Sequence, residues 1–551
     1  MPSISLRSSR VWPLLLLSIS ASFGIGASCR REPAPVIAAM LPRSSIRLYF
    51  LADLDGYLEP CGCQARPLGG IDRIAALVDR ERPAHPHSLF VAAGNLFYEH
   101  PTLEAQMAFQ ERVRAETLGP ILDGLHLAAY AQGPADYALG AEGFRAAAHG
   151  TRARSLGANV VGGDATLVRL VDGVRVGLVG VSDFANAEGV RPDGAPATTD
   201  AVEAARTAVA SLRGRVDVVV VLASVPRRVA RTIAGEVEGV DFVIAARESS
   251  ATPPPPERIG QAHLLTAIDQ GKGLGAIDLY VNGTGPFHDT SDASASAERA
   301  RLDERIHTLA SRIAAWDRDP ATDRAAIAAQ RTRLTEMTAR RTALDHRTVP
   351  TLGRAFEARS FEISPDVARA PSVQAQISTY FHAINERNRL EYASLRAPPP
   401  PPGAPSYVGV EACRDCHEEA YDVWQRTPHG HAYRTLEDAS KNFNLACVGC
   451  HVTGYRQPGG SEVVQNDGLR DVQCETCHGP GSAHVDARNN TARRATIHRD
   501  APADVCAPCH TPEHSDHFNY ATYRPRILGP GHGRPMTDAD AGTPARTAML
   551  P

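Results

Sequence analysis

Lysine is almost absent from this 551-residue sequence, and neither sign of charge is in clear excess. Only Lys272 and Lys441 carry an ammonium group, so arginine supplies nearly all of the positive charge. The formal net charge of −4 is close to neutral for so long a chain and argues against nucleic acid as the main partner. The length predicts more than one domain, with enough material for a conventional core.

Long apolar runs are also missing. The apolar run at residues 11–19 is too short for a comfortable membrane span. It follows arginines and is followed by small residues, which predicts a signal peptide over residues 1–28. Gly26-Ala27-Ser28-Cys29 resembles a bacterial lipobox, so we expect Cys29 to be lipidated and residues 29–45 to form a tether. The alternative is an ordinary signal peptide with an incidental cysteine.

The pattern Cys-x-x-Cys-His occurs four times in the last third of the chain. The copies are Cys413/Cys416/His417, Cys447/Cys450/His451, Cys474/Cys477/His478 and Cys506/Cys509/His510. Two thiols on one short turn can form thioethers with the vinyl groups of a porphyrin, and the following histidine then lies under the iron as its proximal ligand. A pair of zinc ribbons is the alternative, but it leaves each histidine unexplained. The motifs therefore predict four haem c groups.

Between residues 46 and 281, short apolar runs alternate with amphipathic stretches. The runs that predict buried strands are 46–51, 89–93, 174–181, 216–222, 241–245, 263–268 and 276–281. Amphipathic stretches at 71–82, 103–118 and 201–212 predict helices, and residues 168–181, turning at Asp172-Gly173, predict a hairpin. This alternation predicts a layered α/β domain over residues 46–300.

The loops of that domain resemble those of calcineurin-like metallophosphoesterases, in the 5′-nucleotidase branch. The phrases that carry the resemblance are Asp53-Leu54-Asp55-Gly56, Ala93-Gly94-Asn95, Gly157-Ala158-Asn159-Val160 and Val240-Asp241-Phe242-Val243-Ile244. The resemblance implies a site for two metal ions that activate a bridging water. Such a site requires Asp, His and Asn ligands at the strand ends.

Most of those ligands are replaced in this sequence. Asp53 matches the first aspartate, but Asp55 stands in place of a histidine, and Asn95 in place of the bridging aspartate. The remaining departures are Gly133-Pro134-Ala135-Asp136, Ser224 and Ala246-Arg247-Glu248-Ser249. The last of these removes two imidazoles and inserts a cation where a metal ion would bind. We therefore expect a fold without its hydrolase chemistry, with residual phosphoesterase activity as a weaker alternative.

One loop departs from the phosphoesterases. Glu59-Pro60-Cys61-Gly62-Cys63 resembles a loop of exported nucleotidase-like domains that travel with multihaem cytochromes. Cys61 and Cys63 could form a redox-active pair or a soft-metal site. The alternative is a strained local disulfide or two structural thiols, and one intervening residue makes a poor disulfide.

The regions after the α/β domain have different compositions. A heptad seam and a second amphipathic stretch predict a helical hairpin over residues 301–348, and a strand and a helix follow over 349–396. A polyproline linker over residues 397–405 marks the clearest domain boundary. The haem module is expected over residues 406–540. It has few large apolar residues, which suits a mainly helical fold whose core is largely porphyrin.

The module resembles the tetrahaem cytochrome c-554 family. The resemblance lies in the four motifs and in Tyr407-Val408-Gly409, Trp424, Thr427-Pro428-His429, Val452-Thr453-Gly454-Tyr455 and Gly479-Pro480-Gly481-Ser482-Ala483-His484. It implies electron transfer between redox proteins outside the cytoplasm. A haem enzyme that converts a small nitrogen compound such as nitric oxide at one five-coordinate iron is the alternative.

Sixth ligands must come from histidines outside the four motifs. The candidates are His429, His484 and His532, while His431, His514 and His517 are expected to be ordinary surface residues. Three distal histidines would give three bis-histidine haems and leave one iron open, as in the family that the module resembles. The sequence thus predicts a multidomain, exported protein that combines an α/β layered sandwich, a helical hairpin and a mainly helical tetrahaem module.

Overall fold

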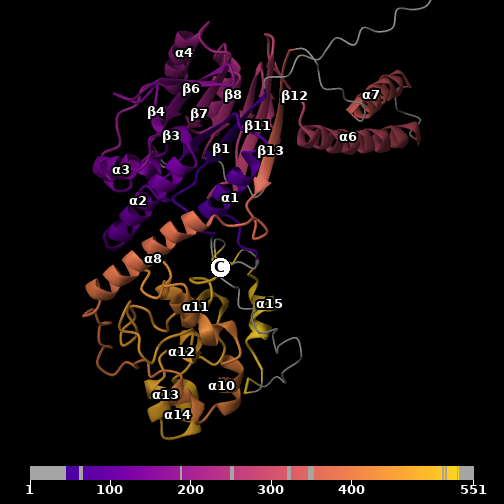
Figure 1. The fold of residues 1–551 in the computed structure, drawn as a ribbon. Helices are drawn as coiled ribbons and strands as arrows, with labels where there is room; N and C mark the ends of the chain where they lie inside the picture. The colour runs from indigo at the N-terminus through magenta and orange to yellow at the C-terminus, as the bar shows by residue number, and fades with distance from the viewer. Residues whose placement is uncertain are drawn as a thin grey trace, which may run out of the picture. The chain divides into compact units, whose positions relative to one another are not determined.

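The computed structural model describes most of the chain (Figure 1). The described residues are 45–60, 66–185, 189–247, 254–318, 324–344, 353–511, 514–515, 518–529 and 531–532. All of them fall within one compact unit, Arg43–Pro551. The predictions for the signal peptide, Cys29, Cys61, Cys63, Glu248, Ser249 and His517 lie outside the described residues.

Two β-sheets form the centre of the N-terminal domain. The seven-stranded sheet has the order β12-β13-β11-β1-β2-β3-β4, and the six-stranded sheet has the order β5-β6-β7-β8-β10-β9. The first sheet contains β1 (Ser45–Ala52), β2 (Ser88–Gly94), β3 (Leu127–Gln132), β4 (Arg154–Leu156), β11 (Gly273–Asn282), β12 (Phe287–Asp289) and β13 (Gly353–Glu362). The second contains β5 (Thr166–Val171), β6 (Val174–Ser182), β7 (Val218–Ser224), β8 (Phe242–Ala245), β9 (Glu257–Ile259) and β10 (Ala262–Leu265).

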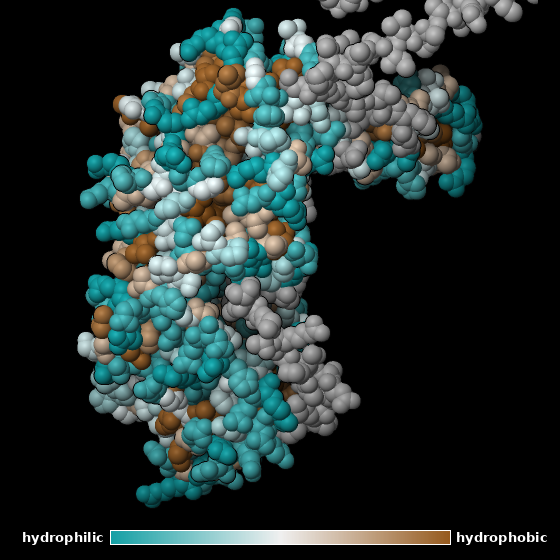
Figure 2. All heavy atoms as spheres, viewed as in Figure 1, coloured by the Kyte–Doolittle hydropathy of each residue, from teal (hydrophilic) through white to brown (hydrophobic). Residues whose placement is uncertain are grey.

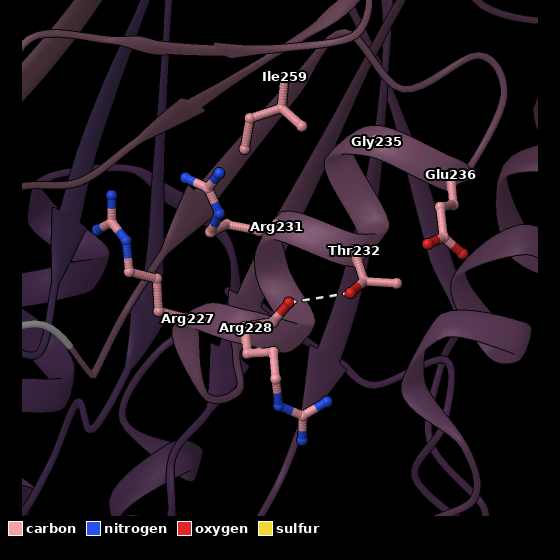
Figure 3. Close-up of a pocket in the computed structure, with 7 residues that line it drawn as sticks. All are labelled: Arg227, Arg228, Arg231, Thr232, Gly235, Glu236 and Ile259. Carbon is pink, nitrogen blue, oxygen red and sulfur yellow. Dashed lines mark hydrogen bonds between the residues drawn. The ribbon is translucent and has the colours of Figure 1, made fainter.

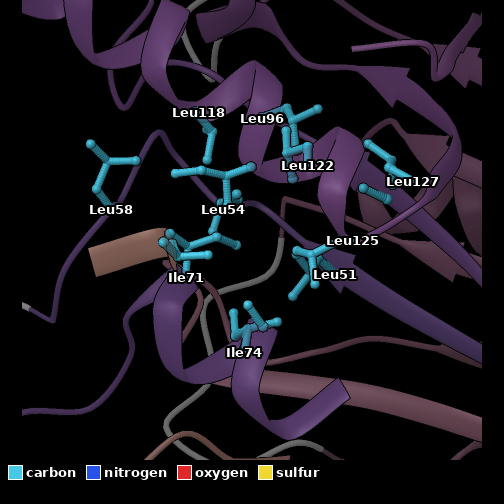
Figure 4. Packing of buried hydrophobic residues seen from close by; sticks show 14 of the residues in the cluster. Leu51, Leu54, Leu58, Ile71, Ile74, Leu96, Leu118, Leu122, Leu125 and Leu127 are labelled. Atoms are coloured by element: carbon cyan, nitrogen blue, oxygen red, sulfur yellow. The ribbon is translucent and has the colours of Figure 1, made fainter. Parts of the chain in front are cut away.

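Apolar side chains divide the domain into four layers. One buried cluster lies between the two sheets and takes residues from β1, β2, β3, β6, β7, β8 and β11. A second cluster joins the first sheet to α1 (Ile71–Glu81), α2 (Ala108–Gly124) and α8 (Pro371–Glu391). Figure 4 labels leucines and isoleucines of this cluster from β1, α1, α2 and β3. A third joins the other sheet to α4 (Ala201–Leu212) and α5 (Arg227–Glu236). The predicted α/β layered sandwich is confirmed.

The apolar runs located most of the sheet. Each predicted run overlaps a strand, and the predicted hairpin is the antiparallel pair β5–β6, with Asp172 and Gly173 at positive φ in its turn. The periodicity missed β3, whose sequence LAAYAQ is rich in alanine, and the three-residue strands β4, β9 and β12. It also missed α3 (Gly140–His149) and α5. Short or alanine-rich segments give too weak an apolar signal for their period to be read.

The helical hairpin consists of α6 (Asp292–Arg318) and α7 (Arg324–Ala343). It is inserted between β12 and β13, which are parallel neighbours that pair Phe287 with Arg354. The first helix begins at Asp292, earlier than the expected start at residue 301, because the seam extends back along the helix to the buried Ala295. The hairpin is therefore an excursion from one sheet edge.

The C-terminal module is built from short helices and loops. Its helices are α9 (Glu411–Arg414), α10 (Glu418–Trp424), α11 (Ala432–Asp438), α12 (Cys474–His478), α13 (Ser482–Asp486), α14 (Asn490–Ala495) and α15 (Tyr520–Tyr523). Its buried apolar cluster contains only Tyr433, Val448, Val452 and Val463. Hydrophilic residues predominate on the face of the module seen in Figure 2. Among the described helices of the whole chain, none has the length and apolar character needed to cross a bilayer.

Candidate haem-binding site

The strand ends of the N-terminal domain bring together several of the residues matched to the phosphoesterase loops. Asp53 follows β1, and its carboxylate accepts hydrogen bonds from the backbone N–H groups of Asn95, at 3.2 Å, and Arg247. The Asn95 side-chain oxygen accepts the N–H of Ala135 at 2.9 Å. Backbone N–H groups thus take some of the acceptor positions of Asp53 and Asn95 that a metal ion would otherwise use.

The guanidinium of Arg247 donates to the carbonyl oxygens of Asp183, at 3.3 Å, and Ala185, at 2.8 Å, whereas the hydrogen bond to Asp53 is made by its backbone N–H. Burial raises the pKa of Asp53, and the positive charge of Arg247 acts in the opposite direction. The expectation of a cation in the position of a metal ion stays a prediction. The left-handed conformation of Arg247, with φ of 64°, turns the backbone rather than the side chain toward the carboxylate.

Burial dominates the protonation of the three carboxyl groups at this end of the sheets. It raises the pKa of Asp53 to about 6, and burial together with the charge of Asp53 raises the pKa of Asp55 to about 9. Burial also raises the pKa of Asp136 to about 7, against the effect of three backbone N–H donors from Phe97, Gly133 and Leu96. A protonated carboxyl group is a poor ligand for a divalent cation.

The described end of β7 carries a serine where the phosphoesterase loops have a histidine. Ser224 ends β7 fully buried, and its hydroxyl has no hydrogen-bond partner among the described residues. The part of the chain that the structure describes contains no group of three or more His, Cys, Asp or Glu side chains placed to hold a metal ion. Whether the domain hydrolyses phosphoesters stays a prediction.

A surface hollow of about 640 Å³ lies beside α5 and β9 (Figure 3). Arg227, Arg228 and Arg231 line it, which makes it a candidate anion site. However, Glu257 forms ion pairs with Arg227, at 2.9 Å, and with Arg231. Because this carboxylate compensates two of the guanidinium groups, the hollow does not concentrate positive charge.

The C-terminal module brings histidines together in three pairs. His417 pairs with His484, with ring centres 6.2 Å apart and ring planes at 26°. His478 pairs with His532, with ring centres 6.3 Å apart and ring planes at 19°. The third pair is His510 with His429, also with ring centres 6.3 Å apart. Each pair joins a motif histidine to one of the three predicted distal candidates.

This spacing fits one metal ion between each pair of rings. Two metal–imidazole bonds of about 2 Å place the coordinating nitrogens about 4 Å apart, and the ring centres then lie about 6 Å apart. Rings that pack directly also reach this separation, as Phe97 and Phe144 do with ring centres 6.3 Å apart. The stronger support is that each of the three pairs joins a motif histidine to a predicted distal histidine, so these residues could hold a haem iron between them.

Hydrogen bonds at Nδ1 fix the orientation of several of these rings. The Nδ1–H groups of His451, His478 and His484 donate to the carbonyl oxygens of Ala432, His498 and Arg493, respectively. Nδ1 of His510 lies 3.1 Å from the hydroxyl oxygen of Ser515. A hydrogen bond at one ring nitrogen leaves the other, Nε2, as the nitrogen with a lone pair for a metal.

Burial lowers the pKa of several of these imidazoles, among them His429 and His417. It lowers the pKa of His429 to about 4, with a smaller effect from the charge of His510. Burial is also the largest cause of the lowered pKa of His417, followed by the charge of His484. A metal ligand must be unprotonated, so these environments suit coordination near neutral pH.

The attachment cysteines show which motifs are neighbours. The thiols of Cys413, in the first motif, and Cys474, in the third, lie close enough for each to shift the pKa of the other. The same holds for Cys450, in the second motif, and Cys509, in the fourth. The third and fourth motifs are also neighbours, because the pKa of Cys477 is raised by burial and then by the charge of Cys506. The attachment sites therefore follow the spatial order first, third, fourth, second.

Comparison with known proteins agrees with this geometry. Residues 412–479 match the family described as cytochrome c554 and c-prime. Cytochrome c-554 of Nitrosomonas europaea is 33% identical over 91 residues. The C-terminal module is similar to cytochrome c-554. This similarity supports a c-type cytochrome role in electron transfer, with haem c as the cofactor.

The match is confined to part of both chains. It covers 14% of this chain and 39% of the Nitrosomonas europaea cytochrome c-554, so the chain spans well under half of that relative. The family match includes the first three motifs and ends before Cys506, Cys509 and His510. The similarity to cytochrome c-554 thus supports haem c and leaves the number of haems open.

Solved structures resemble the chain only distantly. A 5′-nucleotidase precursor from Thermus thermophilus is 15% identical, covers 75% of this chain and 69% of its own, and has a TM-score of 0.43. A Thermus thermophilus sulfate thiohydrolase is 13% identical, with coverage of 62% and 61% and a TM-score of 0.40. NAD nucleotidase from Haemophilus influenzae is 13% identical, with coverage of 44% and 48% and a TM-score of 0.38. Likenesses of this size say nothing about catalysis.

A buried carboxylate holds two motifs of the cytochrome c-554-like module together. Glu475, inside the third motif, is 2% exposed and accepts backbone N–H groups from Val408, at 3.0 Å, and Gly409, at 2.8 Å, which precede the first motif. It also accepts the N–H of Gly481 at 2.7 Å. Val408, Gly409 and Gly481 lie in segments that carry the resemblance to cytochrome c-554. That Glu475 joins these segments depends on tertiary packing and could not be predicted from the sequence.

His514, which was expected to be an ordinary surface residue, is half-buried, and its charge is among the causes of the lowered pKa of His451, of which burial is the largest. His514 therefore lies near the second motif. Its position within eight residues of Cys506 gave no signal of this, because the proximity arises from tertiary packing.

Proposed function

We propose that this protein is an exported tetrahaem cytochrome that carries electrons between redox proteins of the periplasm or cell surface. The observation that carries the proposal is the set of three histidine pairs, each with the ring spacing of two axial ligands. Haem c, when bound, accepts and donates single electrons, and bis-histidine ligation keeps its iron low-spin. The complete fourth motif supports a fourth haem beyond the three within the family match.

Each haem would be held by residues of known position. The eight motif cysteines supply the thioethers and His417, His451, His478 and His510 supply the proximal nitrogens. His484, His532 and His429 would be the distal ligands opposite His417, His478 and His510, respectively. The contacts between cysteines of different motifs support close neighbours throughout the row.

The second candidate function concerns the second motif. The three predicted distal histidines are used by the other three motifs, so none of the three is left for His451. If the site opposite His451 is open, it would admit a small molecule such as nitric oxide, and the protein would be a haem enzyme. His514 is the neighbouring imidazole that would then compete for or contact that ligand.

For the rest of the chain we propose export through residues 1–28, lipidation at Cys29 and a non-hydrolytic N-terminal domain. Hydrogen bonding of Asp53 by backbone N–H groups and the serine at the described end of β7 support the last point. Assay of the full-length protein with nucleoside monophosphates and added manganese or zinc tests it. Robust metal-dependent turnover would contradict it and favour residual phosphoesterase activity.

The decisive experiment combines haem counting with one ligand variant. A pyridine haemochrome assay should give four haems per chain, and two or fewer would reject the proposal. His484→Ala should convert one low-spin haem to high spin in the electron paramagnetic resonance spectrum, because His417 would lose its opposite ligand. His431→Ala, at an exposed position of the same module, is the matched control and should leave the spectrum unchanged.

Carbon monoxide separates the two candidate functions. An electron carrier with every iron six-coordinate should bind the gas poorly, whereas an open iron at His451 should bind it readily in the reduced protein. If carbon monoxide binds, its affinity in His514→Ala tests whether His514 contacts the ligand.

A further inference from the structure

The segment that precedes the second motif is held by side chains of the N-terminal domain. In α8, Asn385 donates to the side-chain oxygen of Asn442 at 3.0 Å and accepts the N–H of Phe443 at 2.8 Å. One helical turn later, Asn388 donates to the carbonyl oxygen of Phe443 at 2.8 Å. These hydrogen bonds hold both the backbone N–H and the carbonyl oxygen of Phe443.

A third amide joins them from α2. The side-chain oxygen of Gln110 accepts the N–H of Leu445 at 3.2 Å and receives the amide of Asn388 at 3.5 Å. Gln110 is 2% and Asn388 4% exposed. Because a buried amide is costly unless it is hydrogen-bonded, two such groups aimed at one loop form a built contact and not a chance surface approach.

A chain of charges reaches the same segment. Asp72, at the start of α1, pairs with Arg369, which lies 3.7 Å from Glu59, and Glu59 pairs with Lys441. The Lys441 ammonium also lies 4.2 Å from the ring centre of Phe381 in α8. One of only two lysines in the chain is thus fixed at this contact.

The held segment leads directly into the second attachment site. The carbonyl oxygen of Asn444 accepts the N–H groups of Cys447, at 3.0 Å, and Val448, at 2.9 Å. Val448 is fully buried in the small apolar cluster of the module, against which Phe443 and Leu445 pack. Any movement of the segment is therefore transmitted to the first turn of Cys447-x-x-Cys450-His451.

The first and third attachment sites are fixed differently, by Glu475 and Gln473 of the module itself. We propose that the N-terminal domain acts as a clamp on the second haem site, with Gln110, Asn385 and Asn388 as positioning residues. The clamp gives a domain that resembles a hydrolase a role in the cytochrome: it sets the environment of one haem, at the end of the row of attachment sites. This inference rests on the proposed haem at the second motif.

The test uses the full-length, haem-loaded protein and the double variant Asn385→Ala/Asn388→Ala. Hydrogen exchange should quicken at the amide of Phe443, and one of the four reduction potentials should shift while the others stay in place. A tenfold change in the ratio of oxidised to reduced haem corresponds to about 59 mV for one electron. Ser378→Ala, at an exposed position of the same helix, is the matched control.

The outcomes separate this inference from the proposed function. A wild-type protein with two or fewer haems would overturn the proposed function. Four haems with unchanged potentials and unchanged exchange in the double variant would overturn the clamp alone. If the double variant does not fold, the single variants Asn385→Ala and Lys441→Met apply the same criteria, and Lys441→Arg should partly restore the wild-type potentials because it keeps the charge without the compact ammonium group.

Discussion

The two halves of this chain reach a folded state by different means. The N-terminal domain buries three apolar clusters on and between two sheets, whereas the haem module buries one cluster of four residues. The module compensates with buried polar groups such as Glu475 and Asn466 and with the haems that its motifs predict. The comparison teaches that a domain with few buried apolar side chains can still have a defined fold when a prosthetic group supplies the missing apolar surface.

Removal of one haem should have the largest effect on stability. It should destabilise the haem module and leave the N-terminal domain folded. Cys474→Ala/Cys477→Ala abolishes the thioethers of the third site, which lies between the first and fourth in space. The module should lose fixed tertiary structure, measured by near-ultraviolet circular dichroism and hydrogen exchange over residues 406–532. The unfolding transition of the N-terminal domain serves as the internal control. A module with native exchange rates would contradict the view that porphyrin replaces its core.

The next effect concerns the buried carboxylate of the module. Glu475→Ala leaves the N–H groups of Gly409 and Gly481 buried without their acceptor and removes the acceptor of the part-buried N–H of Val408. At about 1–3 kcal/mol for each buried group, the module should lose at least about 2 kcal/mol of unfolding free energy. Denaturant titration followed by haem absorbance measures the loss. Glu419→Ala, at an exposed position in the first turn of α10, should change little.

A comparable loss in the N-terminal domain requires an apolar substitution. Leu118 in α2 is fully buried in the cluster between that helix and the first sheet. Leu118→Ala should destabilise this domain by about 2–5 kcal/mol, through lost burial and the cavity left behind. The transition followed by far-ultraviolet circular dichroism should move, with the haem spectrum of the native protein unchanged. Phe109→Ala, 40% exposed on the same helix, is the control, and an equal loss there would contradict the assignment.

The smallest change for each measured step, one pH unit, is a pH dependence confined to the N-terminal domain. The pKa of Asp55 is raised to about 9 by burial and by the charge of Asp53, so the folded state keeps a proton that the unfolded state loses above about pH 4. The stabilisation is complete below that pH and is lost as the pH rises toward 9, by up to about 1.4 kcal/mol per pH unit. Asp55→Asn should flatten this slope in denaturant titrations at several pH values. Asp79→Asn, at an exposed position in α1, should leave the slope as it is.

Local pattern was sufficient for much of the fold and for the chemistry of the motifs. Apolar runs located strands such as β1 and β6, and the spacing of Cys413, Cys416 and His417 identified a haem site without tertiary information. The distal candidates could also be selected by the phrases around them. The alanine-rich β3 and the three-residue strands could not be located from the sequence, since their burial is decided by neighbours that are distant in sequence.

The pairing of ligands was not accessible from the sequence. His484 could have served any of the four motifs, and only the packing of α13 against the first motif places it opposite His417. Likewise, the residues near Asp53 identified a degenerate site, but the choice of backbone over guanidinium at Arg247 depends on a left-handed turn that no pattern specifies. Whether a residue bonds through its backbone or its side chain depends on the tertiary structure.

The strand order of the first sheet has a consequence for the timing of folding. Its central strand β1 pairs Ser45 with Tyr280 in β11, and β11 pairs Gly273 with Glu362 in β13. Such contacts give the domain a high contact order, because loops of more than two hundred residues must close before the sheet is complete. The attachment motifs follow only after residue 412, so on synthesis the domain that would clamp the second haem site can close its sheet before the cysteines of that site emerge.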